Sequence, residues 1–217
     1  FEEEDIIEAV RQLFEAENMP AAVHTYYEEK ITGFHGKNLL IEAKGGQEGP
    51  TIHLNGHLDT VKLCDGWSKN PGGEMVDDRF YGVGALDMKS GCAAAIAAVQ
   101  KFLKTYKAFK GRLLLSLVSV EEGPYGMGTN AMIEDGLLTN IDYSIITEPS
   151  AGFTGHAFPT MCLGARGGYG LTVEFYGKSA HAADPQKGIS AALDASKFVA
   201  ELENINYVED DKLGKGA

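Results

Sequence analysis

The sequence predicts an α/β fold, in which a mixed, mostly parallel sheet is flanked by helices and followed by the start of a small α+β domain. Three observations indicate this fold. Apolar segments of strand length alternate with segments of helical periodicity. Residues 111–120 form a nearly continuous apolar run, which is typical of a strand covered on both faces. Beyond about Gly164 the chain becomes rich in glycine, which indicates a second domain.

The first part of the chain is expected to contain one helix, two strands and a hairpin. Residues 2–17 carry apolar side chains at helical spacing, so we predict a helix there. Strands are predicted over 37–45 and over 49–61. Residues 73–82 are expected to form a hairpin that turns at the Asp-Asp pair in its middle.

The next part continues the alternation of helix and strand. Residues 88–106 are small and apolar, which suits a long helix packed closely on a sheet. The strand over 111–120 follows, then a short helix over 129–138 and a further buried strand over 142–148. This order is that of a layered α/β domain.

The last part of the chain is expected to hold only part of a second domain. Alternation at Leu171, Val173 and Phe175 predicts one strand, and a helix is predicted over 189–202. One strand and one helix do not close a domain by themselves.

Composition excludes some partners. The chain has 217 residues and a formal net charge of −12, from 31 acidic and 19 basic residues. Such a surface repels nucleic acid and anionic lipid. The three cysteines, Cys64, Cys92 and Cys162, lie far apart, which suits a reducing compartment, and Cys92 is expected to be core filler. With no visible signal peptide and no apolar run of membrane length, a cytoplasmic location is expected.

The end of the strand over 49–61 offers a metal-ligand arrangement. His57 and Asp59 are two residues apart, so both side chains lie on one face. A nearby carboxylate holds the tautomer of a histidine ligand and makes its free nitrogen a better donor. The alternative is a structural histidine-aspartate pair. His53 shares the face but lies deeper in the strand, and we interpret it as a packed core histidine.

The segment "YGVGALDMKSG" presents Asp87 just before a helix. It matches a dinucleotide-binding loop poorly, because Asp87 stands where the third glycine would be, and we reject a nucleotide site. A carboxylate at this point can bridge two cations. The alternative is an aspartate that caps the helix.

Three glutamates follow two later strands. Hydrolysis assisted by a metal needs one carboxylate that binds the cation and another that moves protons, and the adjacent Glu121 and Glu122 could divide these roles. Glu148 ends another strand, and Pro149 favours an extended backbone there. Taken singly, each is as well explained by an ordinary acidic turn.

Taken together, these residues favour one site. All of them lie at or just after the carboxyl end of a strand, the edge where an open α/β sheet binds ligands. One histidine with several carboxylates suits zinc, cobalt or manganese. The members of the set are His57, Asp87, Glu121, Glu122 and Glu148.

The motifs "GHLDTV", "GVGALDMKSG", "EEG", "TEPS" and "GKSAHAADPQKGISA" occur in this order along nearly the whole chain. In this respect the sequence resembles the co-catalytic zinc amidohydrolases of the acetylornithine deacetylase, succinyl-diaminopimelate desuccinylase, aminoacylase and carboxypeptidase G family. The resemblance implies a zinc-exopeptidase-like fold and hydrolysis of an amide bond in an N-acyl amino acid or small peptide. A di- or tripeptidase of the same family and a non-catalytic metal-binding or partner-binding fragment remain alternatives.

The resemblance also implies the metal ligands. His57 and Glu148 would bind the first metal, Glu122 would bind the second, and Asp87 would bridge the two. The family's cofactor is Zn²⁺, one or two per chain, with Co²⁺ or Mn²⁺ possible. A cis peptide bond between Asp87 and Met88 is expected by the same resemblance.

The resemblance assigns catalytic roles to three further side chains. Glu121 would be the general base that activates a metal-bound water, and Asp59 would orient His57. His181, in "GKSAHAADP", would reach the reacting carbonyl oxygen.

The family's architecture implies that residues 1–164 are the N-terminal part of a catalytic metal-binding domain. Residues 165–217 would be part of a lid and dimerisation domain, so a homodimer is possible. The family draws a further ligand of the second metal from a C-terminal segment that returns to the catalytic domain. No histidine follows His181, so this segment is expected to be absent and only the first metal site to be complete.

Overall fold

The computed structural model describes residues 4–29, 33–123, 126–150, 160–162, 164 and 170–215. The chain divides into two compact units, Phe1–His156 and Ala157–Ala217. Each is described here by itself.

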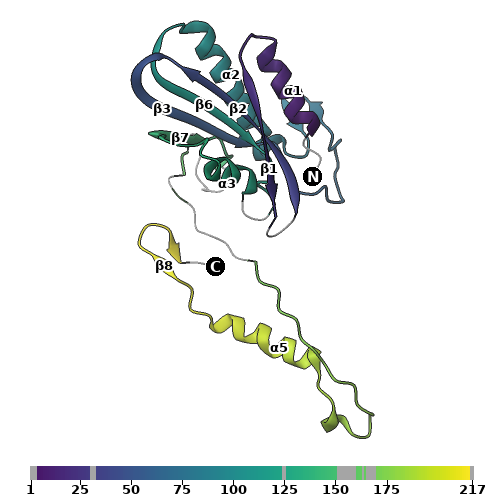
Figure 1. Cartoon of the computed structure of the whole chain (residues 1–217). Coiled ribbons are helices and arrows are strands. Elements are labelled where there is room, and N and C mark those ends of the chain that lie inside the picture. Colours follow the sequence, from purple (N-terminus) through teal and green to yellow (C-terminus); the bar gives the residue numbers. More distant parts are fainter. Residues whose placement is uncertain are drawn as a thin grey trace. The chain divides into compact units, whose positions relative to one another are not determined.

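The first unit is built on a mixed sheet with strand order β1-β2-β6-β3-β7 (Figure 1). The pairs β1–β2 and β2–β6 are antiparallel, whereas β3 pairs in parallel with both β6 and β7. The predicted mixed sheet with helices is confirmed, and within this five-stranded sheet two pairings are parallel and two are antiparallel. The bounds are β1 Ala21–Glu28, β2 Phe34–Lys44, β3 Gly46–His57, β6 Phe109–Val118 and β7 Tyr143–Ile146.

Helices lie on both faces of this sheet. Helices α1 (Glu4–Glu15) and α2 (Ser90–Thr105) pack in one apolar core with Leu39 of β2 and with residues of β6. Side chains alternate along a strand, so the neighbouring Asn38 faces the other side, where it meets helix α3 (Met127–Glu134). The sheet is therefore sandwiched between α1 and α2 on one face and α3 on the other.

The parallel pairings bring three strand ends to one edge of the sheet. His57, the last residue of β3, pairs with Val118, the last residue of β6. Asn55 pairs with Ile146, the last residue of β7. The loops that leave these strands therefore start side by side.

Several predicted elements are confirmed with small shifts. The predicted hairpin is formed by β4 (Glu74–Val76) and β5 (Arg79–Tyr81). Strand β6 stops at Val118, two residues before the predicted end, because Val120 adopts a left-handed backbone with φ 56°. Strand β1 was not predicted from the sequence.

Strand β7 forms where expected, but the prediction that it is buried is wrong. All four of its residues are exposed, including Tyr143 at 63% and Ile146 at 61%. It is the last strand of the described sheet, and the core that α1 and α2 build against the sheet contains no residue of β7.

The second unit contains helix α5 (Ala191–Glu201), which Ser190 caps by accepting a hydrogen bond from the amide of Leu193. A short hairpin joins β8 (Glu209–Asp210) and β9 (Gly214–Lys215). The predicted strand at Leu171–Phe175 is not formed in the described residues. No described strand pairs with that segment, and a strand needs a partner for its backbone groups. Short 3₁₀ turns span Pro185–Lys187 and Leu202–Asn204.

Among the helices that the structure describes, none is both long enough and apolar enough to cross a lipid bilayer.

His53 is a packed core histidine, as predicted. It is 4% exposed, and its two ring nitrogens lie 3.0 Å from Ser144 Oγ of β7 and 2.8 Å from Ser116 Oγ of β6. The ring therefore ties together the three parallel strands. Burial, with a smaller contribution from the positive charge of Arg112, lowers the pKa of His53 from 6.5 to about 4.

This shift predicts a loss of stability in mild acid. Because the pKa is lower in the folded state, the unfolded chain takes up the proton first as the pH falls below 6.5. When the pH is lowered from about 7 to about 5, protonation of this group in the unfolded chain should reduce the free energy of unfolding by about 2 kcal/mol. Urea unfolding of the natural chain and of His53→Gln at both pH values measures it. The variant should be less stable at neutral pH but lose less stability on acidification, and an equal loss in both chains would contradict the assignment.

Candidate metal centre

The carboxyl edge of the parallel strands carries a buried histidine surrounded by carboxylates. The His57 side chain is only 1% exposed. Its Nε2 atom lies 3.2 Å from Asp87 Oδ1, 3.5 Å from Glu148 Oε1 and 3.8 Å from Glu121 Oε2. The structure thus brings together side chains that are up to 91 positions apart in the sequence.

Asp87 is presented by an irregular turn before α2. The peptide bond between Asp87 and Met88 is cis, as the family resemblance predicted. Gly84 opens the turn with φ 69°, and a Cβ atom there would lie 2.2 Å from Thr60 Cγ2, so glycine is required. Met88 is fully buried and anchors the turn, which leaves the Asp87 side chain 44% exposed at the edge.

The glutamate pair follows β6 after two fully buried residues, Ser119 and Val120. The amide of Glu122 donates to Asp59 Oδ2 over 3.0 Å, and the amide of Leu58 donates to the Val118 carbonyl over 2.9 Å. Hydrogen bonds donated by backbone amides therefore join the chain after β3 to the chain at the end of β6.

Glu148 reaches the centre because α2 and the end of β7 approach very closely. A Cβ atom at Gly91 of α2 would lie 2.0 Å from the carbonyl oxygen of Thr147, so only glycine allows this contact. The Glu148 side chain is about one-third exposed.

Asp59 controls the orientation and charge of His57. Nδ1 of His57 faces the Asp59 carbonyl oxygen at 3.1 Å and the Asp59 carboxylate at 3.5 Å, so Nε2 points to the other carboxylates. Burial alone would lower the pKa of His57, but Asp59, then Glu121 and Glu148, outweigh it and raise that pKa to about 9.

The pKa values of the carboxyl groups in the centre shift in two directions. Burial would raise the pKa of Asp59, but His57 and the amides of Glu121 and Glu122 outweigh it and lower that pKa. Burial and the negative charge of Asp87 raise the pKa of Glu122. Burial raises the pKa of Glu148 to about 7, with Asp87 and Glu121 adding to the increase against the opposing charge of His57.

These features fit a divalent cation. Two overlapping sets of ligand atoms lie within 4.8 Å of one another, His57–Asp87–Glu122 and His57–Glu121–Glu148. Burial and the negative charges of their neighbours raise the pKa values of Glu122 and Glu148, and a cation among the carboxylates would offset both effects. One imidazole nitrogen with carboxylate oxygens is a donor set that zinc, cobalt and manganese accept.

His181 lies in the second unit, so its distance from the centre is not defined. It is exposed, and its Nδ1 accepts a hydrogen bond from the Ala183 amide over 3.2 Å.

Two contacts in the centre were not predicted. Besides facing His57, the Asp59 carboxylate accepts a hydrogen bond from the Glu122 amide. It thereby holds residues 119–122, which we call the glutamate turn. Cys92 is buried in the core, as predicted, but its Sγ also donates to the His57 carbonyl over 3.1 Å. The first contact follows from loop geometry that no sequence spacing encodes.

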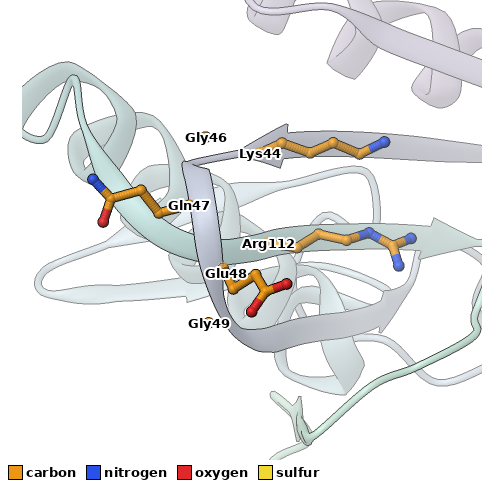
Figure 2. Close-up of a pocket in the computed structure, with 7 residues that line it drawn as sticks. Lys44, Gly46, Gln47, Glu48, Gly49 and Arg112 are labelled. Atoms are coloured by element: carbon orange, nitrogen blue, oxygen red, sulfur yellow. The ribbon is translucent and has the colours of Figure 1, made fainter.

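A shallow hollow lies at the opposite end of the parallel strands, where β3 begins (Figure 2). Lys44 and Arg112, paired across β2 and β6, point the same way, whereas Gln47 points away from them. The Arg112 guanidinium already forms an ion pair with Glu42 and donates hydrogen bonds to two backbone carbonyls. The hollow therefore offers no comparable set of ligands.

Comparison with known proteins agrees with this geometry. The profile of Peptidase family M20/M25/M40 matches residues 53–210. Succinyl-diaminopimelate desuccinylase of Nitratiruptor sp. is 34% identical over 182 residues, which are 82% of this chain and 48% of that protein. The enzyme of the same name from Wolinella succinogenes is 35% identical over 181 residues, 81% of this chain and 47% of that protein. The chain thus spans about half the length of these relatives.

Solved structures show the same fold. Aminopeptidase PepT from Bacillus cereus superposes with a TM-score of 0.53 at 22% identity, over 92% of this chain and 51% of that one. Human carnosine dipeptidase 1 gives a TM-score of 0.54 at 22% identity, over 65% of this chain and 32% of that one. The family match, the identity to the desuccinylases and this shared fold confirm the predicted resemblance: the chain belongs to the M20/M25/M40 family of peptidases.

Proposed function

We propose that this protein hydrolyses an amide bond in an N-acyl amino acid or small peptide with the help of a divalent metal. The observation that carries the proposal is the convergence of His57 with the carboxylates around its Nε2 atom, at the carboxyl edge of an M20 fold. Family membership supports metal-dependent amide hydrolysis as the reaction class.

The proposed metal ligands are His57, Asp87, Glu122 and Glu148, with Asp87 shared between two ions if two are bound. Zinc is the first candidate, and cobalt or manganese would suit the same donors. A bound cation would lower the pKa of water and polarise the carbonyl oxygen of the substrate.

Glu121 is the proposed general base. Its carboxylate lies 3.8 Å from His57 Nε2 and is 48% exposed, so it borders the proposed ligands and is open to water and substrate. It takes a proton from the attacking water and returns that proton to the departing amine. Asp59 supports this chemistry by fixing the ring of His57 from the Nδ1 side.

The second unit supplies the remaining part of the proposal. The motif around His181 supports a role in polarising the reacting carbonyl oxygen, and the second unit is proposed as part of a lid and dimerisation domain. The described free cysteines, Cys64, Cys92 and Cys162, support a reducing compartment such as the cytoplasm.

The substrate is best sought among N-succinyl and N-acetyl amino acids, because the cited relatives of about 34% identity are succinyl-diaminopimelate desuccinylases. The dipeptidase and aminopeptidase that share the fold make small peptides the second candidate class. A panel of N-succinyl, N-acetyl and dipeptide substrates, assayed beside the metal content, separates the two. Stoichiometric metal without turnover of any of them would favour a non-catalytic metal-binding protein.

Replacement of Glu121 by glutamine should separate metal binding from catalysis. The variant should keep its zinc, because Glu121 is not a proposed ligand, while kcat falls about 10²- to 10⁴-fold through loss of the proton carrier. Metal analysis and steady-state kinetics measure the two effects. Glu134→Gln, an exposed glutamate at the end of α3, is the matched control and should behave as the natural chain. Activity that persists in Glu121→Gln would refute the assigned role.

Replacement of Glu148 by glutamine should have opposite effects on metal binding and on stability. Loss of a ligand should weaken zinc binding at least about tenfold by calorimetry. Without metal, at pH 8, the variant should be more stable by about 1 kcal/mol after allowance for solvent screening, because it removes a carboxylate whose pKa is raised to about 7. Thermal unfolding in a chelator measures the second effect, again beside Glu134→Gln. A lower Tm for metal-free Glu148→Gln would contradict the electrostatic account.

A further inference from the structure

The chain between β6 and the glutamate pair takes an unfavourable backbone conformation. Val120 is fully buried and has φ 56°, in the left-handed region. A β-branched residue rarely adopts this region, and it does so only where its surroundings hold it there. Because Val120 directly precedes Glu121 and Glu122, whatever holds it also sets the direction of both carboxylates.

Asn38 of β2 contacts this turn through Ser119 and is not one of the residues of the metal centre. It is fully buried. Its Oδ1 accepts hydrogen bonds from the Ser119 amide over 3.0 Å and from Ser119 Oγ over 3.4 Å. Its Nδ2 donates to the Gly128 carbonyl over 2.9 Å and to His24 Nδ1 over 3.1 Å. Both polar atoms of the side chain are thus bonded, so Asn38 has one defined orientation.

Helix α3 is fixed to the turn by the same residue. A Cβ atom at Gly128 would lie 2.3 Å from the Ser119 carbonyl oxygen and 2.7 Å from Asn38 Oδ1, so glycine permits the contact. The amide of Met127 donates to the Val120 carbonyl over 3.1 Å. The first turn of α3 therefore closes over Val120.

His24 extends this network to the other end of α3. Because the amide nitrogen of Asn38 can only donate, His24 Nδ1 accepts, and its Nε2 donates to Asp135 Oδ2 over 2.7 Å. On the metal side, Asp59 Oδ2 holds the Glu122 amide at 3.0 Å. The glutamate turn is therefore held from two sides, by Asp59 within the centre and by Asn38 outside it.

We propose that Asn38 is a positioning residue for the glutamate pair: through Ser119 and α3 it holds Val120 in the left-handed conformation that directs Glu121 and Glu122 to the metal centre. The catalytic part of this inference rests on the function proposed above. Without the side chain of Asn38, the buried amide of Ser119 has no described acceptor, and the turn relaxes towards an ordinary backbone conformation. A displacement of about 1 Å in a catalytic group can cost about 10²-fold in rate.

The test compares Asn38→Ala with Ser116→Ala in the whole protein loaded with zinc. Ser116 is a matched control because it is also fully buried and polar, and it bonds to His53 and Asn55 instead of the turn. At equal folded fraction, Asn38→Ala should lower kcat at least about tenfold with KM within about twofold, whereas Ser116→Ala should leave both near their natural values. A purely structural role would affect the two variants alike.

A second readout does not depend on activity. Amide hydrogen exchange should show that Ser119 of the natural protein is as protected as Leu115 in the middle of β6. In Asn38→Ala, protection at Ser119 should fall at least about tenfold more than at Leu115. Equal changes at the two amides, or a kcat no lower than that of Ser116→Ala, would overturn the proposal.

These two readouts keep the inference separate from the proposed function. If the natural protein hydrolyses none of the substrates, the proposed function fails, and the exchange result alone decides whether Asn38 holds the turn. If Asn38→Ala does not fold, Gly128→Ala takes its place under the same criteria, since its Cβ would push α3 away from Ser119. Fast exchange of Ser119 in the natural protein would reject the proposal without any variant.

Discussion

The parallel register of β3 with β6 and β7 is the constraint on which the candidate metal centre depends. It places His57 beside Val118 and Asn55 beside Ile146, so that three loops leave the sheet at one edge. A shift of one residue would turn every side chain of β3 to the other face and remove His57 from the carboxylates. His53, bonded to Ser116 and Ser144, favours the observed register from inside the sheet.

A second constraint is electrostatic. Folding gathers carboxylates around one imidazole, and burial, with the negative charges of their neighbours, raises the pKa values of Glu122 and Glu148. The fold tolerates this gathering of carboxylates because contacts of the backbone hold each of the three loops in place. The turn anchored by buried Met88 positions Asp87, the approach of Thr147 to Gly91 positions Glu148, and the Glu122 amide donates to Asp59. The candidate centre therefore has a geometry that does not have to form around a metal, which is the kind of preorganisation that favours catalysis.

Much of this arrangement could be predicted from local sequence. Strand ends marked by His57 and Glu148, and a helix preceded by Asp87, are short-range signals that a parallel sheet converts into proximity. Strand β1 was missed although Val23, Thr25 and Tyr26 are good strand formers, because most of its side chains are exposed or half-buried and its sequence lacks a clear apolar alternation. The exposure of β7 and the absence of a strand at Leu171–Phe175 depend on neighbours, which local periodicity does not specify. The proposed role of Asn38 could not be predicted for the same reason, because its hydrogen bonds join it to residues 81 and 90 positions away in the sequence.

The close approach at Gly91 affects how variation in this protein should be interpreted. The carbonyl of Thr147 occupies the space that any side chain at position 91 would need, and Gly84 and Gly128 face similar obstacles. None of the three carries a side chain that could take part in a reaction, yet each allows two segments to approach closely at the centre or beside it. In a mutational map of activity they would stand out as strongly as the acidic ligands. Intolerance at these positions would report a lack of space for a side chain, so a map of this kind outlines the shape of the site as well as its chemistry.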